Sequence, residues 1–440
     1  MNKDRFSSKL GMILAAAAGS VGLGNVWKFP YMLGENGGAA FLLVYILCVI
    51  LFGLPLMMAE FLIGKEGKGS VYSVYRHLSG TNHWNWLPWL TVTSTTLITG
   101  VYLIIIGWCL GYLYLSITGA VTQVVDINSA GQIFHSFSGN SVQVVLFTTI
   151  SILLSIAMLW AGVNKGVERL SKILMPLLLL LLVILVVRVM FLDDASKGYA
   201  FLFQPNWTCL TPRVVLEAMG QCFYSLSIGM GALITYGAYM PKEQGVAKGS
   251  IQIVVLDTLA ALLAGCAIFP AVFAFGFSPE QGPKLVFEMV PLVFGQMAGG
   301  RWFTLVFFAL LAIAAITSVA FLMEMMVAAL VEATANKRHP LTRHHALILA
   351  GAACLVVSVV CVLSSEVFSW VDFITSTVTL PLIALCTVIF FGWFVADKLM
   401  LNKLSSTNSN KGWVVVFRFL IRWFIPVIIM LILLNGLGAF

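Results

Sequence analysis

Long apolar stretches alternate with short polar breaks along the whole chain. Eleven stretches are each long enough to cross the ~30 Å hydrocarbon core of a bilayer, which takes about 20 apolar residues in a helix. They lie near residues 10–33, 38–63, 87–118, 142–162, 169–192, 213–240, 247–276, 302–335, 344–364, 368–397 and 413–436. The breaks leave no room for a separate soluble domain. The pattern therefore predicts an all-α polytopic membrane protein with a single transmembrane domain over residues 1–440.

Two of these stretches contain the same interruption. Ser20–Gly24 is Ser-Val-Gly-Leu-Gly, and Ser227–Gly231, five stretches later, is Ser-Ile-Gly-Met-Gly. Alternating glycines weaken a helix, and the freed backbone is tolerated inside a bilayer only where it lines a cavity or ligand. Close packing of small residues is the alternative explanation. Matching breaks instead favour a transporter with a midplane site between inverted repeats. We place repeat one at about 10–192, repeat two at about 213–397 and an extra helix at about 413–436.

The composition supports a membrane protein and argues against a soluble one. Hydrophobic residues make up 60% of the chain and charged residues only 10%, whereas a soluble domain carries about 25% charged residues. No nucleophile has a paired base and no glycine-rich phosphate loop follows a strand, so we expect no enzymatic activity and no organic cofactor. The eight cysteines lie almost entirely in apolar stretches, where packing is their ordinary role. We therefore expect no disulfide.

The net charge of +7 follows from membrane orientation. If the N-terminus is cytoplasmic, nineteen Lys and Arg residues fall on or beside inner connections. The outer connections carry only Lys197, Arg213, Lys284 and Arg301. This bias obeys the positive-inside rule. We therefore expect a lipid bilayer around the protein, no nucleic-acid partner, and an external C-terminus after an odd number of spans. We interpret Arg343–His345 as solvated cytoplasmic charge, and the sequence does not distinguish a monomer from a dimer.

Four motifs are specific enough to indicate a family. They are Gly19–Pro30 (GSVGLGNVWKFP), Glu35–Phe41 (ENGGAAF), Gly220–Gly231 (GQCFYSLSIGMG) and Ala315–Glu324 (AITSVAFLME). With them the chain, over about residues 6–398, resembles the neurotransmitter:sodium symporters, and within these the bacterial amino-acid transporters. The resemblance implies eleven helices in a 5+5 inverted repeat, the fold of the bacterial leucine transporter, with helices 1 and 6 unwound. It also implies sodium-driven amino-acid uptake by alternating access in the bacterial inner membrane.

The resemblance implies two sodium sites, which suit a hard cation that prefers oxygen ligands. Site one would use the Ser20 carbonyl, the side chains of Asn25, Ser225 and Asp257, and the substrate carboxylate. Site two would use the carbonyls of Ala18, Val21 and Ala314 and the hydroxyls of Thr317 and Ser318. A Thr-Ser pair can also simply bond back to its own helix. The match to the family at both spans favours the ion site.

Asp257 departs from a common family pattern. Many members have Asn at this position and bind chloride beside it, where Tyr45, Gln221 and Ser225 would also match. A carboxylate in an apolar span needs a partner. We therefore expect Asp257 to supply the fixed negative charge itself, which makes transport chloride-independent. The alternatives are a protonated acid held by local hydrogen bonds and proton coupling through Asp257.

The resemblance also places a substrate pocket. The substrate carboxylate would meet the amides of Leu23 and Gly24, because helix N-termini attract anions, and the hydroxyl of Tyr102. The amine would meet groups around Ser20, Tyr224, Ser225 and Ser227. The substrate side chain would contact Ile98, Ile105, Tyr224, Met230, Ser318 and Leu322. Because this set is apolar and includes a pliant Met, we expect neutral hydrophobic or aromatic L-amino acids. Gly22, where monoamine transporters carry Asp, argues against biogenic amines.

Charged pairs match the family's two gates. Lys28 and Asp372 would close the outer gate. Lys3 and Glu332 would close the inner gate, with Arg5 as the alternative partner of Glu332. Phe6 would plug the inner side, supported by Tyr239. We expect the intramembrane acids Glu60 and Glu324 to bond to backbone or to neighbouring spans, and we assign them no transport role. A proton-coupled transporter of the same fold and a non-translocating amino-acid sensor are the alternative functions.

Overall fold

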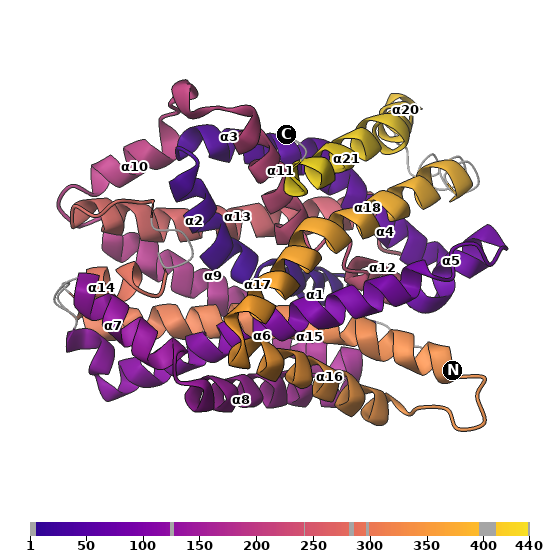
Figure 1. Cartoon of the computed structure of the whole chain (residues 1–440). Helices are drawn as coiled ribbons and strands as arrows, with labels where there is room; N and C mark the ends of the chain where they lie inside the picture. Colours follow the sequence, from indigo (N-terminus) through magenta and orange to yellow (C-terminus); the bar gives the residue numbers. More distant parts are fainter. Residues whose placement is uncertain are drawn as a thin grey trace.

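The computed structural model describes residues 6–123, 127–241, 243–280, 286–295, 299–395 and 411–438. The described residues form helices and connecting turns, with no strand among them. The longest helices run nearly side by side, and the short helices α10 and α5 lie at opposite ends of the bundle (Figure 1). We call these two ends the α10 side and the α5 side.

The first half of the chain forms α1 (Lys9–Ser20), η1 (Gly24–Lys28), α2 (Phe29–Glu35), α3 (Ala39–Cys48), η2 (Val49–Gly53), α4 (Leu54–Gly67), α5 (Val71–Ser79), α6 (Leu87–Thr118), η3 (Ala120–Gln123), α7 (Ile127–Ser138), α8 (Ser141–Trp160), η4 (Val163–Glu168), α9 (Arg169–Val189), α10 (Ala195–Phe203) and η5 (Trp207–Cys209). The second half forms α11 (Pro212–Ser225), α12 (Ala232–Tyr239), α13 (Val246–Ala274), α14 (Met289–Gly295), α15 (Gly300–Thr334), α16 (Arg343–Leu363), α17 (Ser365–Asp372), η7 (Phe373–Thr379), α18 (Leu380–Ile389), η8 (Phe390–Val395), α20 (Lys411–Phe419), η9 (Leu420–Phe424) and α21 (Ile425–Gly436).

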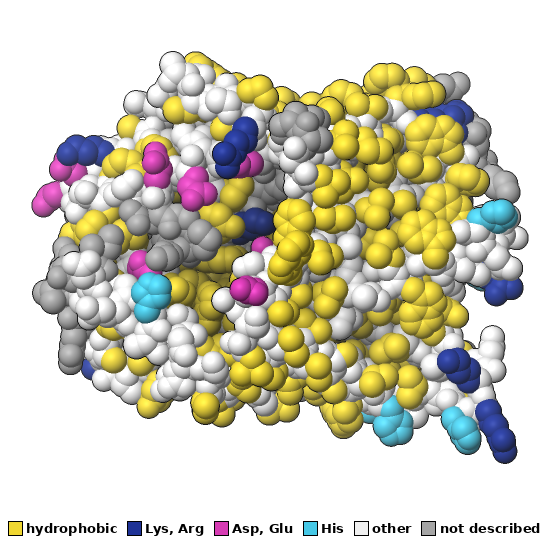
Figure 2. All heavy atoms as spheres, viewed as in Figure 1, with side chains coloured by type: hydrophobic (Ala, Val, Ile, Leu, Met, Phe, Trp, Pro, Cys, Tyr) yellow, Lys and Arg dark blue, Asp and Glu magenta, His cyan; other side chains and the backbone are white. Residues whose placement is uncertain are grey.

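The apolar stretches of the sequence become membrane-length helices. In the described part of the chain, nine helices are long and apolar enough to cross a bilayer, or ten if a pair bent by 48° counts as one. That pair is Lys9–Ser20 with Gly24–Glu35, which together form the first predicted span. The sixth predicted span is divided into α11 and α12. On the face shown in Figure 2, hydrophobic side chains cover much of the surface, as contact with lipid requires.

Both breaks fall where the glycine motifs predict them. At the first, the Gly22 amide donates to Asn25 Oδ1 (3.1 Å) and so does not continue the helical bond to the Ala18 carbonyl. At the second, Ser227, Gly229 and Gly231 all have positive φ angles, of 54°, 80° and 70°. Glycine adopts this conformation without strain. The two breaks therefore expose backbone groups in the middle of the bundle.

Candidate ion and substrate site

A buried polar cluster lies beside the first break. Asn25 (η1), Ser225 (α11) and Asp257 (α13) are each at most 1% exposed. Asn25 Nδ2 donates to Asp257 Oδ1 (2.9 Å), and the Ser225 hydroxyl donates to Asp257 Oδ2 (2.9 Å). Asn25 Nδ2 also donates to the Asp257 carbonyl (2.9 Å). Three side chains of the predicted first sodium site thus meet, and the partners expected for Asp257 are present.

A second oxygen cluster joins α1 to α15. The Ser318 hydroxyl lies 3.4 Å from the Ala18 carbonyl and 3.1 Å from the Ala314 carbonyl, and the Thr317 hydroxyl lies 2.9 Å from Ala314. Oxygen ligands about 2.4 Å from a cation are roughly 3.4 Å apart in octahedral geometry. The Ser318–Ala18 contact, which joins two helices, has this spacing. The bonds from Thr317 and Ser318 to Ala314, and from Thr317 to the Ile313 carbonyl (3.1 Å), are the back-bonds expected of a Thr-Ser pair within one helix.

Aromatic and aliphatic side chains surround a cavity of about 170 Å³ between α6, α11 and α17. Tyr102 and Tyr224 stack at its wall, with ring centroids 5.7 Å apart. Its described lining is Trp27, Lys28, Tyr31, Ile98, Val101, Tyr102, Ile105, Trp108, Tyr224, Phe368 and Asp372. Four predicted pocket residues and both predicted outer-gate residues therefore share one cavity.

The other eight predicted pocket residues are buried but do not belong to the lining of this cavity. They are Ser20, Leu23, Gly24, Ser225, Ser227, Met230, Ser318 and Leu322. The sequence reasoning missed Val101 and Trp108, among others. Val101 follows Ile98 by three residues and precedes Ile105 by four, so helical spacing on one face of α6 was the signal available.

The predicted outer gate is not closed. Lys28 Nζ lies 3.7 Å from the centroid of the Tyr224 ring, a cation–π contact. No ion pair within 4.0 Å joins it to Asp372 among the described residues, although both line the cavity. A second cavity, of about 340 Å³, adjoins Lys28 between α2, α11 and α21. The surface is hollowed near α2, α11 and α17 (Figure 2). The two cavities therefore share Lys28, Tyr31 and Tyr224 in their described lining.

The α5 side has a buried aromatic cluster around Phe6 and, beside Glu332, a cavity of about 650 Å³ whose lining includes Tyr72, Ser73 and Arg76. Phe6 is 4% exposed, and its ring centroid lies 5.5 Å from that of Tyr236 and 6.5 Å from that of Tyr239. Glu332 accepts hydrogen bonds from the Ser70 amide (3.0 Å), the Ser70 hydroxyl (2.7 Å) and the Ser73 hydroxyl (2.6 Å). Lys3, its predicted gate partner, and Arg5, the alternative partner, lie outside the described residues.

Glu60 holds the second break in place. This buried residue of α4 accepts a hydrogen bond from the Gly229 amide (2.8 Å). Thr95 of α6 donates to the adjacent Met230 carbonyl (3.0 Å). The expectation that Glu60 bonds to backbone is confirmed. Its place at the break emerges only from the packing of α4 against α12.

Replacing Glu60 with Ala is expected to destabilise the protein. The Gly229 amide would lose its acceptor inside the bundle, at a cost of about 1–3 kcal/mol. Glu60→Gln keeps an acceptor oxygen and should lie between Glu60→Ala and wild type. Thermal unfolding in detergent would rank the melting temperatures of Glu60→Ala, Glu60→Gln and wild type. Equal melting temperatures for Glu60→Ala and wild type would contradict the assigned bond.

The interpretation of Arg343 as solvated cytoplasmic charge is wrong, because Nη1 donates to Glu324 Oε1 (2.9 Å) and Nη2 to Glu324 Oε2 (2.5 Å). Glu324 is fully buried and also accepts from the Tyr239 hydroxyl (3.0 Å). The prediction that Glu324 bonds to neighbouring spans is therefore confirmed. The turn after α15 brings the start of α16 to this acid, which local charge patterning does not reveal.

Arg343→Met is expected to lower stability by about 2 kcal/mol, because it removes the charged partner of a buried carboxylate. The double variant Arg343→Met/Glu324→Gln should recover part of this loss, since the unpaired charge is removed as well. Thermal unfolding of both variants measures how far the stability effects of Arg343 and Glu324 depend on each other. A double variant less stable than Arg343→Met would contradict the expectation.

Comparison with known proteins identifies the family and similar structures. The chain matches the Sodium:neurotransmitter symporter family over residues 3–130 and 132–440. It is 34% identical to an uncharacterised sodium-dependent transporter of Bacillus subtilis (strain 168), over 99% of this chain and 98% of that protein. A sodium-dependent transporter of Haemophilus influenzae is 29% identical over 99% of both chains. The crystal structure of MhsT in complex with L-phenylalanine is similar with a TM-score of 0.90 and 36% identity, covering 99% of this chain and 100% of that one.

Proposed function

The chain belongs to the sodium:neurotransmitter symporter family, and we propose that it imports neutral hydrophobic or aromatic L-amino acids together with sodium by alternating access. The observation that carries this proposal is the cavity whose walls include Ile98, Ile105, Tyr102 and Tyr224. Aliphatic and aromatic walls suit an apolar side chain. The structural relative with bound L-phenylalanine supports the same substrate class.

Two sodium ions would accompany the substrate. The first would bind near Asn25, Ser225 and Asp257, and the second among the oxygens of Ala18, Ala314 and Ser318, with Thr317 and the Val21 carbonyl beside them. The hydrogen bonds that Asp257 accepts support a fixed carboxylate at the first site. Chloride-independent transport follows from that charge.

The same proposal assigns the membrane orientation. Counting α11 and α12 as one broken span gives eleven helices, with α1–α9 and α11–η8 as the two inverted repeats and α20–α21 as the extra helix. The α5 side would face the cytoplasm of a bacterial cell, because the Lys and Arg excess lies on the connections of that side. The cavity near Lys28 would then open to the outside, and the C-terminus would be external.

Substrate binding in two salts tests the function. Purified protein would be titrated with radiolabelled phenylalanine, leucine and tryptophan in sodium chloride and in choline chloride, with glycine, aspartate and lysine as competitors. We expect saturable binding in sodium alone, displaced by large apolar amino acids and not by the three competitors. Equal binding in both salts would contradict sodium coupling.

Accumulation in sealed proteoliposomes separates the remaining alternatives. An inward sodium gradient is expected to drive uptake above equilibrium. Binding without accumulation would indicate a sensor instead. Uptake that follows an imposed pH gradient in the absence of sodium would indicate proton coupling.

A further inference from the structure

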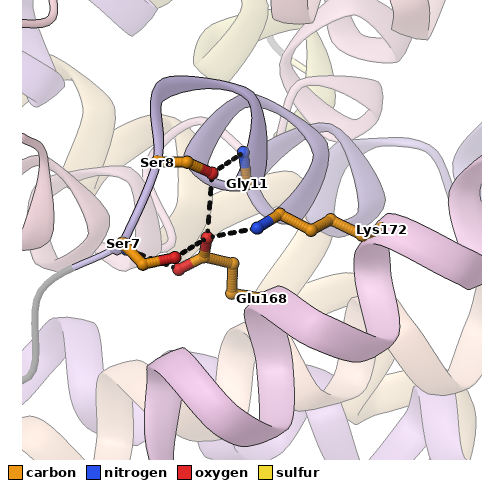
Figure 3. Close-up of polar contacts among 5 residues, drawn as sticks. All are labelled: Ser7, Ser8, Gly11, Glu168 and Lys172. Carbon is orange, nitrogen blue, oxygen red and sulfur yellow. Dashed lines mark hydrogen bonds and ion pairs between the residues drawn. The ribbon is translucent and has the colours of Figure 1, made fainter.

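A single buried carboxylate connects the start of α1 to the start of α9. Glu168, the last residue of the π-helical segment η4, is 1% exposed. Its Oε2 accepts from the Ser7 amide (2.6 Å), and its Oε1 accepts from the Ser7 hydroxyl (2.6 Å), the Ser8 hydroxyl (3.0 Å) and Lys172 Nζ (2.7 Å). Figure 3 shows these donors converging on the carboxylate from the segment that leads into α1 and from α9. Ionised acceptors form the stronger hydrogen bonds in proteins.

The contact is close enough to constrain the sequence around it. A Cβ atom on Gly11 would lie 2.0 Å from Glu168 Oε1, so a larger residue there would displace the carboxylate. Ser8 has two roles, because its Oγ also accepts from the Gly11 amide (3.0 Å) and so caps α1. The donation from Ser8 to Glu168 is additional to what capping requires.

The other end of the same helix carries the second oxygen cluster. α1 has 12 residues, so it is about 18 Å long and moves as one rigid element. Near its end, the Ala18 carbonyl lies 3.4 Å from the Ser318 hydroxyl. α1 packs against α9, α13 and α15. A swing of its start away from α9 would therefore break the bonds to Glu168 and also shift Ala18 relative to Ser318.

We infer that Glu168, Ser7, Ser8 and Lys172 form a latch that holds α1 closed toward the α5 side and whose release is coupled to sodium release. This inference rests on the proposed sodium-coupled transport. A cation that binds only where the oxygens of Ala18 and Ser318 converge favours the latched position. By linkage, weakening the latch must then weaken sodium binding.

Ser8 offers variants that separate the latch from helix capping. Ser8→Asp still caps the helix, because Asp accepts from the Gly11 amide as well as Ser does. It removes the donor to Glu168 and places a second carboxylate beside it. Ser8→Thr keeps both roles and is the matched control. Ser7→Ala removes one donor at an exposed position and serves as a milder latch variant. Asp194→Asn changes the net charge by one unit at the exposed Lys197–Asp194 ion pair and controls for a change of net charge far from the latch.

Hydrogen exchange measures how often α1 opens in the full-length protein, and sodium titration measures whether that opening weakens sodium binding. In nanodiscs, amide exchange over residues 9–20 in sodium-free buffer is expected to be about 10-fold faster in Ser8→Asp and about 3-fold faster in Ser7→Ala, through opening of α1. The sodium concentration for half-maximal phenylalanine binding should rise about 5-fold in Ser8→Asp. Ser8→Thr and Asp194→Asn should match wild type in both measurements.

The outcomes separate the latch from the proposed function. If Ser8→Asp and Ser7→Ala exchange and bind sodium like Ser8→Thr, capping is the only role of this contact and the latch is wrong. Faster exchange with unchanged sodium dependence would also overturn the coupling between latch and sodium release. A wild-type protein that binds phenylalanine equally in sodium and choline would instead refute the proposed function.

Discussion

Asp257→Ala is expected to reduce sodium-driven uptake roughly 100-fold. The substitution removes the acceptor of the Ser225 hydroxyl, and a buried donor left without a partner costs about 1–3 kcal/mol. One acceptor of the Asn25 amide is removed as well, but this amide keeps its bond to the backbone carbonyl of residue 257. It also removes the fixed negative charge from the proposed first sodium site. A loss of about 2.7 kcal/mol corresponds to 100-fold in affinity. Initial rates of phenylalanine uptake into proteoliposomes measure the effect.

Asp257→Asn is the matched variant, because it keeps the size and one acceptor oxygen but removes the charge. We expect its uptake to depend on external chloride, which can replace the missing negative charge near Tyr45 and Gln221. Wild-type uptake should stay the same when gluconate replaces chloride. Loss of wild-type uptake in gluconate would contradict chloride independence, and equal rates for Asp257→Asn in both anions would contradict the assigned role of the charge.

Gly22→Ala is expected to produce the second large effect. A Cβ atom at this position would lie 2.1 Å from the Ser318 hydroxyl oxygen, closer than any real contact. The hydroxyl must then leave the cluster that it forms with the carbonyls of Ala18 and Ala314. Losing one charge-assisted contact costs about 1.5–3 kcal/mol, so half-maximal binding should require roughly 10- to 100-fold more sodium.

Sodium titration of phenylalanine binding checks this expectation. Gly220→Ala is the matched control, because an added Cβ there meets nothing within 4 Å. Both substitutions add the same methyl group to a glycine beside the site. Equal sodium dependence in the two variants would show that Ser318 does not act at the second sodium site.

The helices and their breaks could be predicted because their causes are local. An apolar run about 20 residues long forms a membrane helix wherever it occurs. Two Ser-x-Gly-x-Gly motifs interrupt such runs, and the structure breaks α1 from η1 and α11 from α12 at those motifs. The sequence also predicted that Asp257 needs a partner, because burying an unpaired carboxylate in a membrane span costs free energy. Asn25 and Ser225 were named in advance, but by family resemblance rather than by physics.

Other contacts were decided only by how the helices pack. Glu60 meets Gly229 across 169 positions, and Glu168 meets Ser7 across 161. The i,i+4 spacing indicates the bond between Glu168 and Lys172, but nothing near Glu60 or Glu168 in the sequence indicates Gly229 or Ser7 as a partner. Arg343 has the local pattern of solvated charge, yet it pairs with the buried Glu324.

The physical reason is that sequence patterns act over a few helical turns, whereas hydrogen-bond partners depend on which faces of distant helices meet. The sequence by itself determined an all-helical membrane protein, the positions of its helices and the two places where the helical backbone breaks. Only the tertiary structure decided which acids hold those breaks and helix ends, and that Lys28 lies over Tyr224 rather than on Asp372.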